Sequence, residues 1–145
     1  MQNRFKFRVW HKKRKKMYEV LHLHTETLTN GGEWVTAKGF NIITQQDIHI
    51  NIEPKDGVIM QCTGLKDKNG KLIYEADIVR FKDNITINGS KTHISVIEHN
   101  EAFNAFMYHA ECMGLYTVNK AQNEKFNIEV IGNIYENKEL LNDSN

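Results

Sequence analysis

The sequence predicts a mainly β protein in which an amino-terminal β-hairpin region precedes a small closed β-barrel. Two observations support this fold class. Short segments alternate apolar and polar residues, which is the period of a strand with one buried face. Asn-Gly and Asp-Gly pairs separate several of these segments, and such pairs favour the tight turns that join antiparallel strands.

The first strands form a hairpin with a basic tip. Apolar and basic residues alternate over 4–10, as in a half-buried strand, and strand character returns over 17–23. Between them, the tip 11–16 is almost entirely basic. Since like charges at a tip repel one another, we expect a group outside the tip to help order it.

The amino-terminal region ends near the only proline. Three isoleucines alternate strictly with polar residues over 47–52, which predicts a strand with one apolar face. Pro54 ends this strand because proline cannot donate to a β-ladder, and the Asp-Gly pair after it favours a turn. We therefore expect an amino-terminal β region at 1–57, followed by the barrel with a short carboxy-terminal turn or helix at 58–145.

The stretch 58–81, VIMQCTGLKDKNGKLIYEADIVRF, begins the barrel. Its Asn69-Gly70 pair predicts a hairpin with a type I′ turn, which needs a positive φ at both central residues. Asp77 is placed to hydrogen-bond nearby backbone in a sharp turn before the next strand. Strand, hairpin, turn and new strand in this order are typical of small closed barrels.

Three pieces of sequence, spread over nearly the whole chain, carry a family resemblance. Arg8-Val9-Trp10 with Lys16-Met17 forms the first, residues 60–79 the second, and Val130–Asn137 with 139–141 the third. In order and spacing they resemble the YopX family of phage and prophage proteins. The family motif includes Thr63, Gly64, Asp67, Asn69, Gly70, Tyr74, Asp77, Gly132, Asn133 and Tyr135. The resemblance implies an SH3-like barrel and a phage or prophage accessory protein, but no assigned activity.

The sequence departs from the family pattern at a few positions. Ala76 stands where the family usually has glycine, His11 where aspartate is common, and Lys138 where proline is common. Because alanine rarely adopts a positive φ, the residue at position 76 predicts that this turn does not need one.

Composition predicts a soluble intracellular protein without a membrane segment, and the family resemblance implies the cytoplasm of a bacterial host cell. The chain has 145 residues, a formal net charge of +1 and two cysteines, Cys62 and Cys112. Its apolar runs are far shorter than the ~20 residues that cross a bilayer. Two cysteines do not make a disulfide framework, so we expect free thiols in a reducing compartment.

Metal, cofactor and catalytic roles find little support in the sequence. His22 and His24 point to one side of a predicted strand, but a metal needs further ligands, and nothing in the sequence brings His49 to them. Cys112 and His109 would face apart on a strand. Turn hydrogen bonding explains Asp67 and Asp77, and solvation explains Glu75. We therefore expect no metal, no cofactor and no catalytic residues, and hence no enzyme.

Two binding functions remain. The first hypothesis is a non-catalytic protein-interaction module, which binds an unknown protein partner or a second copy of the chain through exposed strand edges. The alternative is a nucleic-acid-binding module in which the tip contacts phosphates. A simpler interpretation of the basic tip is a solvated loop without a binding role. Its residues are Lys12, Lys13, Arg14, Lys15 and Lys16. Tyr74, Tyr135, Phe103 and Trp10 are candidates for an aromatic binding surface, although such residues more often belong to a core.

Overall fold

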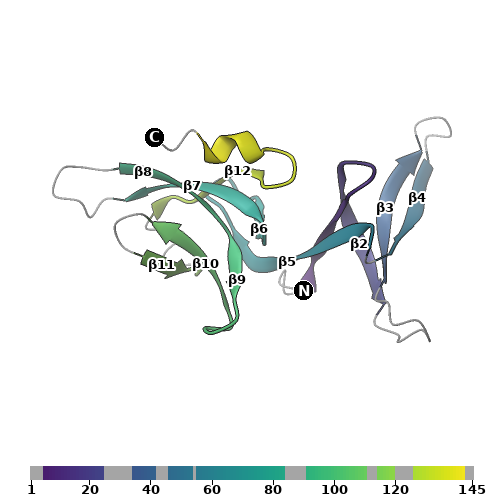
Figure 1. Cartoon of the computed structure of the whole chain (residues 1–145), viewed down its shortest axis with the longest axis horizontal. Coiled ribbons are helices and arrows are strands. Elements are labelled where there is room, and N and C mark those ends of the chain that lie inside the picture. Colours follow the sequence, from purple (N-terminus) through teal and green to yellow (C-terminus); the bar gives the residue numbers. More distant parts are fainter. Residues whose placement is uncertain are drawn as a thin grey trace. The chain divides into compact units, whose positions relative to one another are not determined.

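The computed structural model describes residues 5–24, 34–41, 46–53, 55–83, 91–110, 114–119 and 126–142, which are mainly β (Figure 1). The strands are β1 (Phe7–His11), β2 (Lys16–His24), β3 (Trp34–Asn41), β4 (Gln46–Ile52), β5 (Gly57–Lys66), β6 (Leu72–Tyr74), β7 (Asp77–Asp83), β8 (Lys91–Val96), β9 (Glu98–Asn100), β10 (Ala105–Ala110), β11 (Gly114–Thr117) and β12 (Glu129–Asn133). The short 3-10 helix η2 (Lys138–Leu141) follows. No helix in these ranges is long and apolar enough to cross a membrane. The mainly β prediction is confirmed.

The chain divides into two compact units. The amino-terminal unit comprises Lys6–Gln61, and the carboxy-terminal unit comprises Phe5 and the described residues from Cys62 onward. Strand β5 runs through the division: its first half pairs with β1 and its second half with β6. The boundary that we expected after residue 57 stays a prediction.

The amino-terminal unit is an antiparallel sheet in the order β4-β3-β2-β1-β5. Val9 of β1 lies opposite Tyr18 of β2 on one side and Ile59 of β5 on the other. Val9 and Tyr18 form the core of the unit with Ala37 and Ile52. The alternating isoleucines of β4 point toward this core, and their exposure rises from 2% at Ile52 to 36% at Ile48. The alternation in the sequence therefore predicted the buried face correctly.

The carboxy-terminal unit contains the sheets β12-β7-β8 and β11-β10-β9. The chain passes from the first sheet to the second at Ile97, which is fully buried between β8 and β9. Its N–H donates to the Asp77 carbonyl (2.9 Å), and its carbonyl accepts from the Ala76 N–H (2.8 Å). Phe81 of β7 packs edge-on against Tyr108 of β10, with ring centroids 4.8 Å apart. Side chains from both sheets thus share one core.

The closed SH3-like barrel is not confirmed. Among the described residues the strands form open sheets: β12 and β8 are the edge strands of one sheet, and β11 and β9 are the edge strands of the other. Contact between the sheets is made through buried side chains and the corner at Ile97 rather than by a continuous ladder. Alternation and turn residues are local signals, so they predict strands and hairpins without determining whether the last strand pairs with the first.

Candidate functional site

The hairpin between β5 and β6 has a three-residue loop, Lys68 to Gly70. The Gly70 N–H donates to the Asp67 carbonyl (3.0 Å), and the Asp67 N–H donates to the Lys71 carbonyl (2.8 Å). Gly70 has a φ of +82°, whereas Asn69 is not among the described residues with positive φ. The hairpin prediction is confirmed, but the type I′ turn is wrong. A turn followed by a left-handed glycine is the usual three-residue alternative.

The Asp67 carboxylate holds this loop and joins it to β12. One oxygen, Oδ1, accepts from the Asn69 and Lys71 N–H groups at 2.8 and 2.9 Å. The other, Oδ2, accepts from the buried Val130 N–H at 3.0 Å. Because Asp67 is only 6% exposed, three backbone donors satisfy a carboxylate that is mostly removed from water. This motif residue stabilises the fold.

Thr63 and Gly64 form an irregularity within β5. The register changes between the pairs Cys62↔Tyr74 and Lys66↔Leu72, which leaves extra residues on β5. Gly64 has a φ of +86°, a conformation that glycine adopts at little cost. The Thr63 hydroxyl donates to the Ile73 carbonyl (3.0 Å) and accepts from the Leu65 N–H (3.2 Å). These residues shape a β-bulge.

The corner between β6 and β7 contradicts the prediction for position 76. Ala76 has a φ of +64° and is 6% exposed, so this turn does require a positive φ. Asp77 is 1% exposed, and its Oδ2 accepts from the Tyr74 N–H at 2.8 Å. The expected turn hydrogen bond of Asp77 is confirmed. The Ala76 carbonyl also accepts from the Ile134 N–H (3.0 Å), which ties the corner to the end of β12.

The carboxy-terminal motif forms a polar turn after β12. The Asn133 side-chain oxygen accepts from the Tyr135 and Glu136 N–H groups at 3.1 and 3.0 Å, and its amide donates to the Glu136 carboxylate at 2.7 Å. A Cβ on Gly132 would lie 2.6 Å from Asn137 Oδ1 and 2.8 Å from its Cβ. Glycine is therefore needed there for the close approach of Asn137, while Asn133 caps the turn.

The residues that the sequence raised as possible catalytic or metal-binding sets lie only partly within the described part of the chain. Among the residues that the structure describes, no three His, Cys, Asp or Glu side chains lie together as a metal site. Cys112 and the side chains of His24 and His109 lie outside the described residues. The remaining acidic candidate, Glu75, is half-buried beside the corner.

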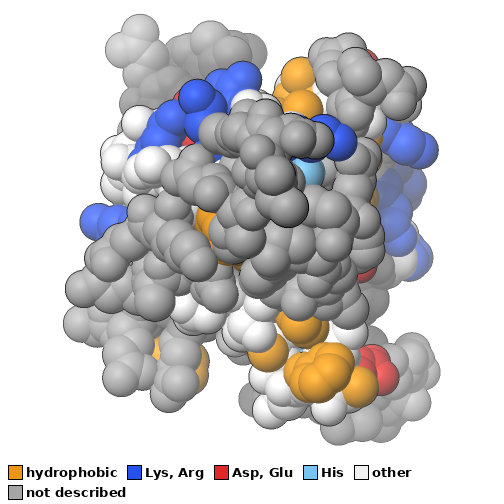
Figure 2. Space-filling view, turned by 90° about the vertical axis from the view of Figure 1, so that its left-hand side faces the viewer, with side chains coloured by type: hydrophobic (Ala, Val, Ile, Leu, Met, Phe, Trp, Pro, Cys, Tyr) orange, Lys and Arg blue, Asp and Glu red, His pale blue; other side chains and the backbone are white. Residues whose placement is uncertain are grey.

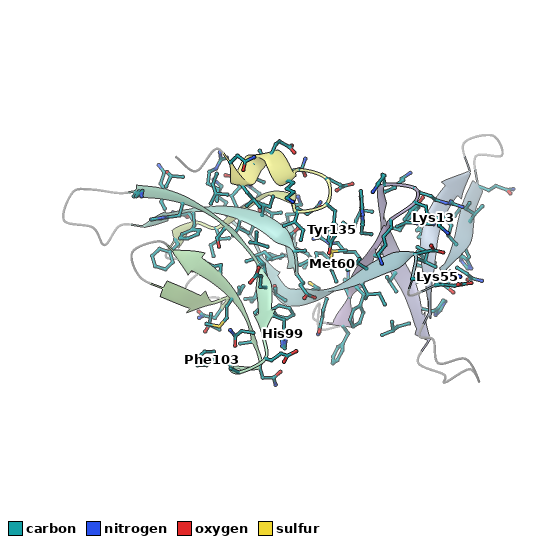
Figure 3. All side chains as sticks on the ribbon, viewed as in Figure 1. Lys13, Lys55, Met60, His99, Phe103 and Tyr135 are labelled. Carbon is teal, nitrogen blue, oxygen red and sulfur yellow. The ribbon has the colours of Figure 1, made fainter. Side chains whose placement is uncertain are left out.

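The four candidate aromatic residues do not share one environment. Trp10 is 6% exposed and belongs to the buried residues, whereas Phe103 is 68% exposed at the turn between β9 and β10. Tyr74 and Tyr135 are partly buried. Phe103 and Tyr135 are labelled in Figure 3, where they lie on different elements of the carboxy-terminal unit.

The basic tip connects β1 and β2, and all five of its cationic residues are exposed. A neighbouring turn orders it, as expected for a run of like charges. The Lys12 N–H donates to the Asp56 carbonyl (2.8 Å), and the Lys12 ammonium donates to the Lys55 carbonyl (3.1 Å). The Lys13 ammonium lies 2.8 Å from the Asp56 carboxylate and lowers the pKa of that carboxyl. Figure 3 labels Lys13 and Lys55 on these adjoining turns.

The remaining charges of the tip are largely uncompensated. Lys16 lies over the Tyr18 ring at 5.6 Å, which is a cation–π distance. Arg14 and Lys15 make no ion pair with a described residue. Lys15 has a φ of +51°, and its N–H donates to the His11 carbonyl at 2.9 Å. The backbone of the tip is therefore fixed while most of its cations face solvent.

A second charged cluster was missed by the sequence analysis. Glu129 of β12 meets two cations at the same oxygen: Lys68 Nζ lies 2.9 Å and Arg80 Nη2 3.0 Å from Oε2. Hydrogen bonds from these two groups lower the pKa of Glu129 to about 2. The only local sequence pattern that could have indicated this cluster is the spacing of Arg80 and Lys82, which places both side chains on one face of β7. The partner Glu129 is remote in sequence.

The geometry defines a class of protein: a two-unit β protein whose motif residues hold turns and bulges, with exposed cations at a hairpin tip and in a charged cluster. The chain belongs to the YopX family, since the family model described as YopX protein matches residues 6–142. The chain is also similar to protein EF1440 from Enterococcus faecalis, known from a crystal structure. The two share 27% sequence identity over 94% of this chain and 96% of that chain, with a TM-score of 0.63. None of the curated proteins matches the chain.

Proposed function

We propose that the chain is a non-catalytic accessory protein of a phage or prophage that contacts nucleic-acid phosphates through its basic tip. The observation that carries this proposal is a hairpin end with a hydrogen-bonded backbone and five consecutive exposed cations. Among the described residues, only the Asp56 carboxylate forms an ion pair with one of these cations. The sequence alone favoured protein interaction. Because the geometry of the tip is fixed, we place nucleic-acid contact before protein interaction.

Physical arguments support phosphate contact at this tip. A hairpin end held by hydrogen bonds loses less conformational freedom on binding than a mobile basic loop does. Lys and Arg side chains that replace condensed counterions supply most of the non-specific affinity for DNA. A two-stranded β-ribbon also has the right width to enter the major groove. The proposed contacts are to the backbone of the nucleic acid, without base-specific readout.

The test compares two double variants with the same change in charge. Arg14→Gln/Lys15→Gln removes two cations that have no described ion pair, whereas Lys38→Gln/Lys55→Gln removes two that pair with Asp47 and Glu53. Affinity for duplex DNA is measured by fluorescence anisotropy at several salt concentrations. Each phosphate contact contributes about 0.9 to the slope of log affinity against log salt. The tip variant should therefore lower the slope by about 1.8, and the control should change it far less.

Two results would reject this function. One is the absence of DNA binding by the wild type at about 50 mM salt, where phosphate contacts are strongest. The other is an equal reduction of the slope by the tip variant and the control, which would assign the affinity to diffuse positive charge. Circular dichroism of both variants checks that the sheet is intact.

A second candidate function is protein interaction through strand β4. This strand ends the sheet order, and its residues Gln46–His49 are exposed. An extended segment of a partner, or a second copy of the chain, can add to such an edge through backbone hydrogen bonds. Ile48 is 36% exposed and would supply apolar contact.

Light scattering over a concentration series tests self-association at this edge. Ile48→Lys places a charge in the proposed contact, and His49→Lys places one on the opposite face of the same strand. The edge function predicts an increase in mass with concentration that Ile48→Lys abolishes and His49→Lys preserves. A partner other than a second copy is sought by capture on the immobilised wild type and on immobilised Ile48→Lys. The edge function is rejected if the mass stays that of a monomer and the wild type captures no protein that Ile48→Lys fails to capture.

A further inference from the structure

The charged cluster around Glu129 opens onto a cleft in the carboxy-terminal unit. The cleft has a volume of about 380 Å³ and is lined by Lys68, Arg80, Phe81, Lys82, Thr92, Asn127 and Glu129. Its walls come from the β5–β6 hairpin loop, β7, β8 and the start of β12. Figure 2 shows Lys and Arg side chains with a few acidic atoms beside them at the upper left of its view.

The backbone fixes the two sides of this cleft relative to each other. The loop that carries Lys68 is joined to the β12 segment twice, through the Lys68 N–H to the Ile128 carbonyl (2.9 Å) and through Asp67 Oδ2 to the Val130 N–H (3.0 Å). Arg80 lies directly opposite Glu129 in the β7–β12 ladder. The cations are therefore placed by hydrogen-bonded backbone and not only by their mutual attraction to Glu129.

The charges in the cleft do not balance. Lys68, Arg80 and Lys82 provide three positive charges against the single carboxylate of Glu129, a net charge of +2. A phosphomonoester carries about −1.5 to −2 at neutral pH and offers three acceptor oxygens. Arginine adds a planar fork of donors that suits phosphate. Thr92 and Asn127 line the same space, and their side chains carry neutral hydrogen-bond donors.

We propose that this cleft binds a phosphomonoester group, contacted by Lys68, Arg80 and Lys82. Glu129 acts as an internal counterion: its Oε2 brings the Lys68 and Arg80 head groups together, and the phosphate competes with it for them. The phosphate comes from a free nucleotide or from the terminal phosphate of a nucleic acid. This site is separate from the basic tip, and neither proposal requires the other.

The test titrates the ¹⁵N-labelled full chain with adenosine 5′-monophosphate, with adenosine as the phosphate-free control, and with inorganic phosphate. A trinucleotide with and without a 5′-phosphate distinguishes the two sources, because the basic tip sees the same backbone in both. The proposal predicts shifts of the Lys68, Arg80 and Glu129 amide signals that require the terminal phosphate. Binding of the monophosphate alone assigns the site to free nucleotides, and binding of the phosphorylated trinucleotide alone assigns it to nucleic-acid ends.

Variants separate binding from structure. Lys82→Gln removes a cation for which no ion pair is described and should weaken binding about tenfold, as expected for one charged contact. Lys71→Gln, an exposed lysine of the same hairpin that does not line the cleft, should have no effect. Glu129→Gln removes the competing carboxylate and should strengthen binding. Equal shifts with and without the phosphate, or equal affinities of Lys82→Gln and Lys71→Gln, would overturn the proposal while leaving the test of the basic tip untouched.

Discussion

Replacing Asp67 by Asn should destabilise the carboxy-terminal unit by about 2–4 kcal/mol. An asparagine oxygen can still accept from the Asn69 and Lys71 N–H groups, as Asp67 Oδ1 does at 2.8 and 2.9 Å. Its amide then faces the buried Val130 N–H, which donates to Oδ2 at 3.0 Å in the native protein. Two donors cannot pair. The lost buried bond costs about 1–3 kcal/mol, and the loss of charge weakens the other two by about 0.5 kcal/mol each.

Replacing Asp67 by Ala should cost more, about 3–5 kcal/mol. All three backbone donors then lose their acceptor, although water can reach those of the exposed loop, Asn69 and Lys71. The difference between the two variants reports what remains of the bonds within the loop, while the Asn variant reports mainly the connection to β12. Asp47→Asn is the matched control: its carboxylate is 62% exposed and, among the described residues, pairs only with Lys38, so the change should be below about 0.5 kcal/mol.

Chemical denaturation with two probes measures these effects. Both tryptophans, Trp10 and Trp34, belong to the amino-terminal unit, so their fluorescence follows that unit, while far-UV circular dichroism follows the whole chain. Asp67→Asn should shift the circular dichroism transition, and it should shift the fluorescence transition only if the two units unfold together. A circular dichroism midpoint for Asp67→Asn equal to that of Asp47→Asn would refute the role assigned to this carboxylate.

Four further variants test the charged cluster and the turns. Glu129 has a pKa lowered from 4.5 to about 2, so its stabilisation of about 1–2 kcal/mol, reduced by solvent screening, should be full above pH 4.5 and lost as the pH falls toward 2; the stability difference from Glu129→Gln should shrink over that range. Gly132→Ala should cost about 1–3 kcal/mol because the new methyl group meets Asn137, with thermal denaturation as the measurement. Ala76→Gly should stay within about 1 kcal/mol of wild type, since relief of the left-handed strain is offset by a lost buried methyl group and a more flexible unfolded chain. Ala76→Val should be clearly less stable, because a β-branched side chain tolerates positive φ poorly.

Local patterns predicted the strands of the amino-terminal hairpin, strand β4 and the strands within 58–81. The alternation over 47–52 gave both the position of β4 and the face that it buries, since a period of two depends only on neighbouring residues. The basic tip was likewise found from consecutive residues, and its need for an outside group followed from like-charge repulsion. Asp56 and the Lys55 carbonyl meet that need. Features set by adjacent residues were therefore accessible from the sequence.

Features that depend on distant parts of the chain were not accessible. Asp67 was expected to bond within its own turn, and it does, but its bond to Val130 spans 63 positions. Arg80 and Glu129 are 49 positions apart, so their shared cluster appears only once β7 and β12 pair. The prediction for the backbone conformation of position 76 was wrong for a different reason. Alanine disfavours a positive φ by only about 1–2 kcal/mol, and the hydrogen bonds of the corner, including those to Ile97 and Ile134, are sufficient to impose it.

The contacts of the family motif also indicate where function should be sought. Asp67 and Asn133 direct their side chains to backbone donors, and Gly64 and Gly70 adopt positive φ. Side chains committed to backbone conformation are not available to a ligand, so these motif residues account for a shared fold without specifying a shared partner. The cations of the tip and of the cleft are different. The side chains of Arg14 and Lys82 make no described hydrogen bond that holds a turn, and neither forms an ion pair with a described residue. If ligand binding depends on the side chains of Asp67 or Asn133 instead of these cations, the assignment of the motif to folding fails.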